Sequence, residues 1–433
     1  MTDPAAHPAD RVGPADRLWL AALLVLALTP AIMVVWRQAA VAIFPLLALL
    51  LVAAVLRAGK GRHLAAALRE ELRRPLGIAT VVALAYMGAS ITWAINPDDA
   101  ASRFQDVLLT VLVAAVLLTA ARLLPARAVA LALPLGLAIA ALLLLANAYT
   151  DSAVNAWLGR GDRASHLNRA ANAIVVFLPL AAALLFARGQ RLAAVALVGL
   201  AAVAVMGTQS WASRLVLVLV LLAAPLALRW PLAMHRLLLA AIVVSILTMP
   251  VLAGRLNALI PDTVHAFVGY SSLTIRGEAW QEYAALVHLR PILGFGLQGA
   301  RDPATTFASP AMATVDPALY AHAQDLNEHQ RMLLSFLHPH NLPLQVWVDL
   351  GAVGAAFAIL LVVLVFRRME RLAPPFLPAA TLAALALFVI ACVGYGAWTA
   401  WWLGFWALVA LAFRLGSRAH EATGDQAIPK TSR

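Results

Sequence analysis

Apolar residues are gathered into runs of about 18–24 residues, separated by short polar segments. A helix needs a run of this length to cross the roughly 30 Å of hydrocarbon in a bilayer. The runs are apolar all round, whereas a helix in a soluble core has apolar and polar faces. They predict about twelve membrane-spanning helices, near residues 17–36, 40–56, 76–95, 106–121, 128–148, 170–187, 192–209, 214–228, 237–254, 342–366, 373–393 and 396–413.

Composition supports an all-α integral membrane protein. Of the 433 residues, 63% are hydrophobic and only 12% are charged. A soluble protein of this length could not bury so much apolar surface. The single cysteine, Cys392, excludes an intrachain disulfide framework. The first apolar run has full length and no small-residue cleavage site, so we expect it to be a retained span and not a signal peptide.

The formal net charge of +11 would suggest a nucleic-acid partner in a soluble protein. Here the basic residues gather in the loops on one side of the predicted spans. The positive-inside rule places those loops and both termini in the cytoplasm. We therefore expect membrane lipids, and not nucleic acid, around this charge. The basic residues concerned are Arg57, Lys60, Arg62, Arg69, Arg73, Arg74, Arg122, Arg127, Arg188, Arg191, Arg229, Arg236, Arg367, Arg368, Arg371 and Lys430.

The spans and loops divide the chain into four parts. Residues 1–254 form a bundle of about nine spans, 255–341 a large loop on the non-cytoplasmic side, 342–413 the last three spans, and 414–433 a cytoplasmic tail. Within the loop, residues 276–289 and 316–337 are helix-like, and the glycine- and proline-rich stretch 291–317 between them is turn-rich. We expect a small helical subdomain there. Tryptophans at outer span ends fit an interfacial belt: Trp93, Trp211, Trp398, Trp401 and Trp402.

The strongest local signal is His338-Pro339-His340-Asn341, where the long loop re-enters the membrane. An imidazole at such a depth can take a proton near neutral pH and serve as a general base. The alternative is an interfacial histidine that caps a helix or contacts a lipid headgroup.

Arginines at the outer edge form a second signal. Arg276, followed by Trp280, begins a helix-like segment, and Arg214 lies at the outer mouth of the eighth span. Arginine suits phosphate because its forked donor set is permanently charged. The alternatives are headgroup binding, or an ion pair with Glu278, Glu282 or Asp349.

Other polar residues are weaker candidates. Arg169 and Asn172 at the start of the sixth span could line a cavity or cap a helix. Asp98 and Asp99 are adjacent carboxylates without further metal ligands, and we expect no metal site. Asp349 is the main charge inside a span and lies within about three turns of His340. This position favours orienting a site over forming a transport path.

These residues resemble a pattern of the bacterial O-antigen ligase family, often called WaaL, within the O-antigen ligase and polymerase superfamily. The pattern is His, then Asn, Ser or Gln, nine residues, and Gly-x-x-Gly. Here it is read as His340-Asn341, residues 342–350 and Gly351-Ala352-Val353-Gly354. Arg276 to Trp280, Gly294-Phe295-Gly296 and Arg214 are similar to further superfamily elements.

The resemblance implies a GT-C-like glycosyltransferase in the bacterial inner membrane with its active site facing the periplasm. Such ligases move O-antigen polysaccharide from undecaprenyl pyrophosphate to the lipid A-core oligosaccharide, without a nucleotide or metal cofactor. His340 or His338 is then the candidate base. Arg214, Arg276, Arg169, Asn341 and Trp280 are the candidate substrate-binding residues.

Other functions remain open from the sequence. An O-antigen polymerase uses the same kind of donor but a second lipid-linked repeat as acceptor, and a protein O-oligosaccharyltransferase has similar architecture. A transporter of lipid-linked glycan belongs to a different class. Transporters tend to place charges at mid-membrane in repeated halves. In this chain the polar residues concentrate at one face and in one loop, which favours an enzyme.

Overall fold

The computed structural model describes residues 13–125, 129–159, 167–259, 261–264 and 272–424. Within these ranges every regular element is a helix. Eleven of the described helices are long and apolar enough to cross a membrane. The predicted all-α membrane fold is therefore confirmed. Arg127 and Lys430, which the sequence assigns to cytoplasmic segments, lie outside the described residues.

The described helices coincide with the twelve predicted spans. Eleven qualify by length: α1 (Pro14–Val35), α2 (Ala39–Arg57), α4 (Pro75–Ala89, continued by a 3-10 turn), α5 (Pro97–Ala120), α6 (Val129–Tyr149), α8 (Asn168–Ala187), α10 (Trp211–Arg229), α11 (Pro231–Leu259), α18 (Leu342–Met369), α19 (Phe376–Val393) and α20 (Ala400–Gly424). The remaining predicted span is α9 (Arg191–Met206), which has 16 residues. Its length of about 24 Å falls short of the hydrocarbon thickness.

The helices form two compact units. The first unit contains residues 1–71, 111–210 and 404–433, and the second contains 72–110 and 211–403. The boundaries that the sequence suggests near residues 254 and 341 both lie inside the second unit. The long predicted loop therefore belongs to the same compact unit as the spans on either side of it.

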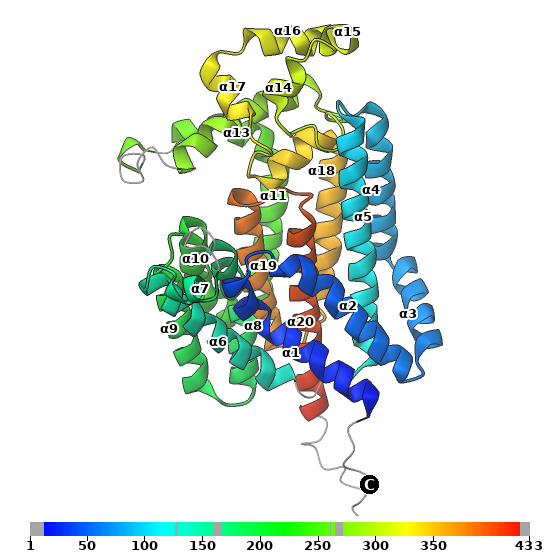
Figure 1. Ribbon diagram of the computed structural model, residues 1–433, viewed down its shortest axis with the longest axis vertical. Helices are drawn as coiled ribbons and strands as arrows, with labels where there is room; N and C mark the ends of the chain where they lie inside the picture. Colours follow the sequence, from blue (N-terminus) through cyan, green and yellow to red (C-terminus); the bar gives the residue numbers. More distant parts are fainter. Residues whose placement is uncertain (1–12, 126–128, 160–166, 260, 265–271, 425–433) are drawn as a thin grey trace, which may run out of the picture. The chain divides into compact units, whose positions relative to one another are not determined.

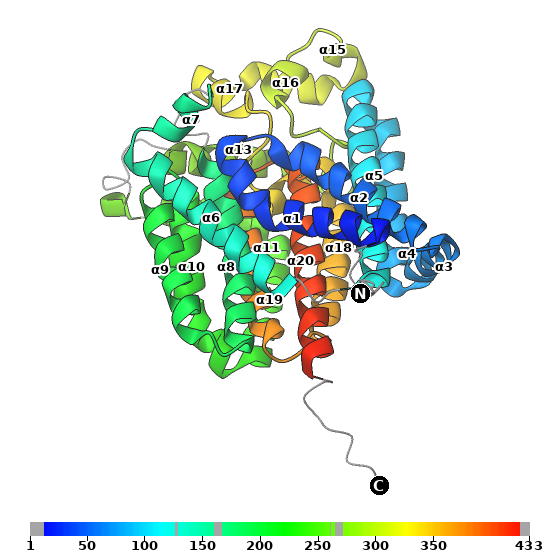
Figure 2. The same cartoon turned by 60° about the horizontal axis from the view of Figure 1, so that its bottom comes forward.

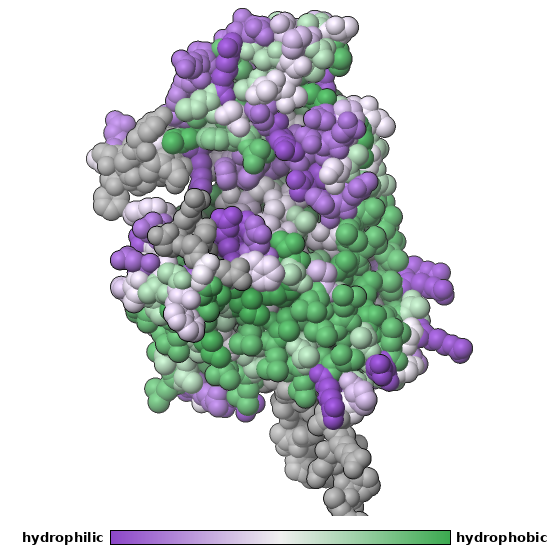
Figure 3. All heavy atoms as spheres, viewed as in Figure 1, coloured by the Kyte–Doolittle hydropathy of each residue, from purple (hydrophilic) through white to green (hydrophobic). Residues whose placement is uncertain are grey.

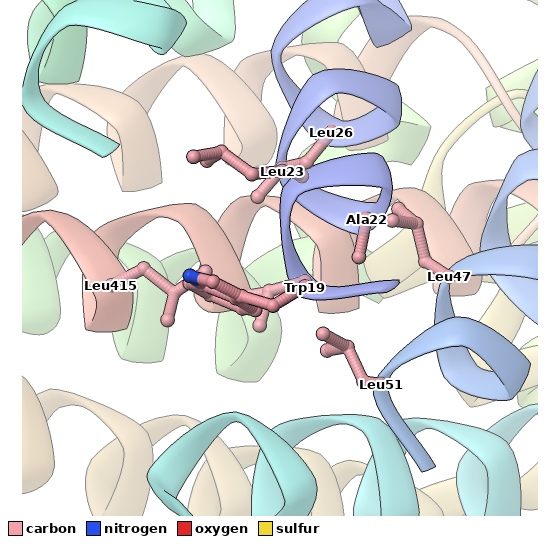
Figure 4. Close-up of a pocket in the computed structure, with 8 residues that line it drawn as sticks. Trp19, Ala22, Leu23, Leu26, Leu47, Leu51 and Leu415 are labelled. Atoms are coloured by element: carbon pink, nitrogen blue, oxygen red, sulfur yellow. The ribbon is translucent and has the colours of Figure 1, made fainter. Parts of the chain in front are cut away.

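The first unit is built on close contacts between apolar helices. Helix α1 packs against α2 and α6, and α8 packs against α6 and α9 (Figure 2). Gly136 permits the α1–α6 approach, because a Cβ at this position would lie 2.0 Å from the carbonyl oxygen of Ala27. Figure 4 shows an apolar recess between α1, α2 and α20, lined by Trp19, Ala22, Leu23, Leu26, Leu47, Leu51, Leu411 and Leu415. No charged or histidine side chain lines it, so it offers no chemistry.

Segments that the sequence assigns to one side of the membrane meet within the first unit. The Lys60 ammonium donates to the carbonyl of Leu123 at 3.0 Å. Arg122 pairs with Glu71 on α3 (Gly61–Arg73), and Arg418 donates to the carbonyl of Ala121 at 2.6 Å. The predicted same-side placement of these loops and of the C-terminal end of α20 agrees with these contacts.

The second unit contains α4, α10, α11, α18 and α19 together with the helices of the long loop. These are α13 (Ser272–Leu289), α14 (Pro303–Phe307), α15 (Met312–Val315), α16 (Pro317–Asp325) and α17 (Glu328–Leu334). In Figure 1, α14 to α17 lie beyond the first turn of α18. Hydrophilic residues gather over them and over the adjacent ends of α4 and α5 in Figure 3, whereas hydrophobic residues cover the parts of α4 and α5 farther from them.

The predicted helix-like segment 316–337 is two helices and not one. The first ends at Asp325, and Asn327 starts the second, because its side chain accepts from the amide of Gln330 while the Gln330 side chain accepts from the amide of Asn327. This capping box satisfies amides that a continuous helix would bond internally. The break turns α17 back toward α13.

Helix α18 is broken at Gly351, which has φ 61° and ψ −160°. The loop after α13 enters the break and replaces the hydrogen bonds that a continuous helix would make. The carbonyl of Val348 accepts from the amide of Phe295 at 2.8 Å, and the amide of Ala352 donates to the carbonyl of Pro291 at 2.9 Å. The carbonyl of Leu350, beside the break, accepts from the hydroxyl of Tyr86 on α4 at 2.9 Å. The long loop is thereby fixed to the membrane-embedded part of the unit.

Candidate functional site

The two candidate histidines lie on a tight turn directly before α18. Pro339 restricts the backbone between them, and His340 adopts a positive φ of 54°, which non-glycine residues rarely adopt. The indole N–H of Trp280 on α13 donates to the carbonyl of Pro339 at 2.7 Å. The two imidazole centroids are 4.2 Å apart. A strained turn held by tertiary contacts thus presents both rings in one place.

A hydrogen bond determines which nitrogen of His340 carries its proton. Nδ1 lies 2.5 Å from the carbonyl oxygen of Gly394, in the segment after α19. A carbonyl oxygen only accepts, so Nδ1 donates and the neutral ring has its lone pair on Nε2. Within the described ranges no residue hydrogen-bonds to Nε2 of His340. This is the tautomer that a general base requires.

The surroundings lower the pKa of both histidines, which favours neutral rings. Burial lowers the pKa of His340; the Gly394 carbonyl opposes this change, and the positive charge of Arg276 adds to it. Burial, His340 and Arg276 together lower the pKa of His338 to about 4. Nε2 of His338 is buried without a hydrogen-bond partner among the described residues. Of the two candidate bases, His340 is therefore the one with a free Nε2 among the described residues, and burial favours the neutral form of His338 beside it.

Arg276 is the cation of this site. It lies in the first turns of α13, and its charge is felt by both imidazoles. Burial lowers its own pKa. Within the described ranges it forms no ion pair and no hydrogen bond. A half-buried guanidinium left in this state is suited to an anionic ligand.

The carboxylates that could have neutralised Arg276 are bound elsewhere. Glu278 pairs with His329 at 3.1 Å, and Glu282 accepts from the side chain of Gln330 at 3.1 Å. Both contacts join α13 to α17. Asp349 is fully buried and accepts from three other groups. The ion pairs that the sequence left open as alternatives are therefore absent from the described part of the chain.

The other two candidate arginines have different surroundings. Arg214 lies in the first turn of α10, with its guanidinium 5.3 Å from the centroid of the Trp211 ring and its Nε buried without a hydrogen-bond partner. It belongs to the same unit as His340, and within the described ranges no hydrogen bond or ion pair joins the two. Arg169 belongs to the first unit, where it donates to the carbonyl of Arg37 at 3.4 Å.

Two candidate binding residues have structural contacts. Trp280 is only 5% exposed, and its N–H is occupied by Pro339. The Asn341 side chain accepts from the amide of Leu344 at 3.0 Å and so caps α18. Asn341 is also buried and lies 3.4 Å from the sulfur of Met249. Their observed contacts shape the turn that carries the histidines.

Sequence reasoning missed the Gly394 carbonyl, which contacts His340, and the two side chains Gln345 and Trp398, which hold the segment that contains Gly394. Gln345 accepts from the amide of Ala397 at 2.8 Å, and Trp398 donates to Asp349 at 2.6 Å. The sequence interpretation of Trp398 as a belt residue did not include this hydrogen bond, and Trp402, placed in the same belt, is fully buried. The sequence contained one indication of this arrangement. Asp349 is a charged residue inside the span that begins beside His340, and a buried charge needs partners.

The adjacent acidic residues at the start of α5 do not gather metal ligands. Asp99 pairs with Arg301 at 3.2 Å and accepts from the side chain of Asn96 at 3.2 Å. Among the described residues no group of three His, Cys, Asp or Glu side chains is placed to hold a metal ion.

Known proteins are similar to the part of the chain that contains this site. Residues 175–359 match the family model described as O-antigen ligase. This range includes every candidate residue except Arg169. Two similar proteins carry names that predict a polysaccharide ligase: one from Rickettsia prowazekii, 26% identical over 135 residues, and one from Rickettsia felis, 27% identical over 135 residues. In each case the match covers 30% of this chain and 30% of the relative. The resemblance to the O-antigen ligase family that the sequence predicts is therefore confirmed over residues 175–359.

Proposed function

We propose that this chain is an O-antigen ligase of the bacterial inner membrane. It transfers O-antigen polysaccharide from undecaprenyl pyrophosphate to the lipid A-core oligosaccharide, at the periplasmic face, with both termini in the cytoplasm. The observation that carries the proposal is the pair formed by His340 and Arg276. His340 offers a neutral ring whose Nε2 has no hydrogen-bond partner among the described residues, and Arg276 offers a cation that pairs with none of the described carboxylates.

The pair provides the two functions that glycosyl transfer needs. Nε2 of His340 takes the proton of the acceptor hydroxyl as its oxygen attacks the anomeric carbon. The bond from that carbon to the pyrophosphate oxygen breaks, and the electron pair leaves with the pyrophosphate. Arg276 stabilises the negative charge that develops there. A single displacement of this kind inverts the anomeric centre.

Arg214 is the second cation that we assign to the donor pyrophosphate. Its buried Nε lacks a hydrogen-bond partner among the described residues, and an anionic oxygen would satisfy it. Trp280 and Asn341 hold the turn that carries the histidines, and we assign them this indirect role in place of substrate binding. Arg169 is left without a role in the transfer step. With two guanidiniums for the leaving group, the proposed mechanism requires neither a metal nor a nucleotide, in keeping with a GT-C-like enzyme.

A reconstituted assay tests this function. The purified protein in lipid nanodiscs is given undecaprenyl-pyrophosphate-linked polysaccharide with either lipid A-core or a second lipid-linked repeat as acceptor. We expect polysaccharide on the lipid A-core, and His340→Ala to reduce kcat by about 10²–10⁴-fold. Transfer only to the lipid-linked repeat would identify a polymerase instead. Full activity in both His340→Ala and His338→Ala would overturn the proposed mechanism.

A further inference from the structure

The segment between α19 and α20 is attached to α18 by two buried side chains. The Gln345 side-chain oxygen accepts from the amide of Ala397 at 2.8 Å, and the Asp349 carboxylate accepts from the indole N–H of Trp398 at 2.6 Å. Gln345 is 2% exposed and Asp349 is 0% exposed. We call residues 394–398 the acceptor loop, because it contains the Gly394 carbonyl that accepts from His340.

Asp349 also joins the acceptor loop to the long loop. Its Oδ1 accepts from the amide of Ala300 at 2.6 Å, and its Oδ2 accepts from the side chain of Gln345 at 3.3 Å. Every partner of this carboxylate is a donor, which is the arrangement that stabilises a buried acceptor. The two side chains lie one helical turn apart on α18 and therefore hold the acceptor loop at two consecutive residues.

The acceptor loop touches both histidines. Gly394 provides the carbonyl for Nδ1 of His340, and Gly396 packs so closely on His338 that a Cβ there would lie 3.2 Å from the imidazole. The φ and ψ of Gly394 are −122° and −79°. Its carbonyl belongs to the peptide that leads into the following residues, of which Ala397 and Trp398 are bonded to Gln345 and Asp349.

We propose that Asp349 and Gln345 are positioning residues for His340: through the acceptor loop they keep the Gly394 carbonyl in line with Nδ1 and thereby keep the lone pair on Nε2. The inference rests on the proposed function only in taking His340 as the base. Neither side chain contacts substrate in this account. Their effect reaches the reaction through a backbone carbonyl, as the partner of a catalytic imidazole commonly does.

The direction of the effect follows from the groups that face His340. The Gly394 carbonyl raises the pKa of His340, whereas burial and Arg276 lower it, and His338 is the other titratable neighbour. Loosening the acceptor loop removes the one influence that raises this pKa. The ring should then titrate at lower pH and lose its preference for the Nδ1–H tautomer.

Trp398→Phe is the first test, because it removes one indole hydrogen bond and keeps an aromatic ring. Its matched control is Trp347→Phe on α18, which removes an indole bond of 2.7 Å to the carbonyl of Ile246 and leaves the acceptor loop alone. Gln345→Met, which removes the acceptor of the Ala397 amide, is the second test. Thermal unfolding confirms that each purified variant is folded.

Two readouts separate positioning from a merely structural role. The rate at which diethyl pyrocarbonate modifies His340, followed by mass spectrometry across pH, reports the titration of the ring without substrate. We expect this profile to shift to lower pH in Trp398→Phe and Gln345→Met but not in Trp347→Phe. In the transfer assay the same two variants should lose about tenfold in kcat with KM unchanged.

The outcomes distinguish this inference from the proposed function. If both variants modify with the wild-type pH profile, the acceptor loop does not position His340 and the inference is wrong. If the profiles shift as expected but the wild type transfers no polysaccharide, the positioning stands and the proposed function fails. An equal loss of kcat in Trp347→Phe, with no shift in any profile, would show that the helix is generally sensitive and would also overturn the inference.

Discussion

At the residue scale, two histidines separated by one proline have different surroundings. The spacing of the O-antigen ligase pattern favours His340, but no local pattern shows which ring has a partner. That partner is the carbonyl of Gly394, 54 positions along the chain. A backbone acceptor can belong to any residue type, so its place could not be predicted from the sequence. The same holds for Trp280, whose N–H reaches Pro339.

The charge of Arg276 should be visible in the pH dependence of the reaction. Because this charge lowers the pKa of His340, Arg276→Gln should raise that pKa. More of the ring is then protonated at a given pH, and the acidic limb of the kcat profile should move to higher pH. KM for the lipid-linked donor should also rise. Arg301→Gln, which removes an arginine paired with Asp99, is the control that leaves the acidic limb in place.

His338 should make the fold sensitive to acid. Its pKa falls from 6.5 to about 4 on folding, so the unfolded state binds more protons between these values and stability is lost as pH falls through them. From pH 7 to pH 5 this amounts to about 2 kcal/mol. His338→Gln should lose less stability than wild type over that interval, as measured by thermal unfolding in detergent. Equal losses would contradict the buried, neutral state of this ring.

At the element scale, the decisive feature is the break in α18. The positions of the spans could be predicted, because the length of an apolar run is a local property of the sequence. The break could not, because it depends on backbone contacts between Gly351 and the loop at residues 291–295. Glycines in both segments were visible as a pattern. Only the structure shows that they meet, and that the break leaves Asp349 facing the acceptor loop.

Gly351→Ala should therefore disrupt the site. A Cβ at this residue would lie 2.3 Å from the carbonyl oxygen of Ile292, and φ is 61°. Strain and overlap together should cost about 3 kcal/mol or more and reduce transfer activity in proportion to the folded fraction. Gly254→Ala on α11 is the control, since its nearest contact would be at 4.0 Å. Comparable stability of the two variants in thermal unfolding would contradict the observed break.

At the scale of the whole molecule, the sequence predicts which loops share a side and which side is cytoplasmic. The structure agrees with the first part within each unit, as the contacts of Lys60 with Leu123 and of Trp93 with Leu293 show. The second part rests on the distribution of positive charge. The division into two compact units could not be predicted, because each unit combines segments that are distant in the sequence.

Cysteine labelling tests the orientation. In a Cys392→Ala background, Ala65→Cys on α3 and Ala313→Cys on α15 each place a thiol at an exposed position. A membrane-impermeant maleimide applied to intact spheroplasts should label residue 313 and leave residue 65 unlabelled until the membrane is opened. The reverse pattern would place the long loop in the cytoplasm, away from any periplasmic acceptor.

The most direct measurement is a lipopolysaccharide gel of a strain lacking this gene, paired with an assay for polymer still linked to undecaprenyl pyrophosphate. We predict loss of the whole O-antigen ladder with accumulation of long lipid-linked polymer. The gene should restore the ladder, and its His340→Ala variant should not. A core-plus-one-repeat band would show that ligation continues and that the chain is a polymerase, and an unchanged ladder would contradict the proposed function altogether.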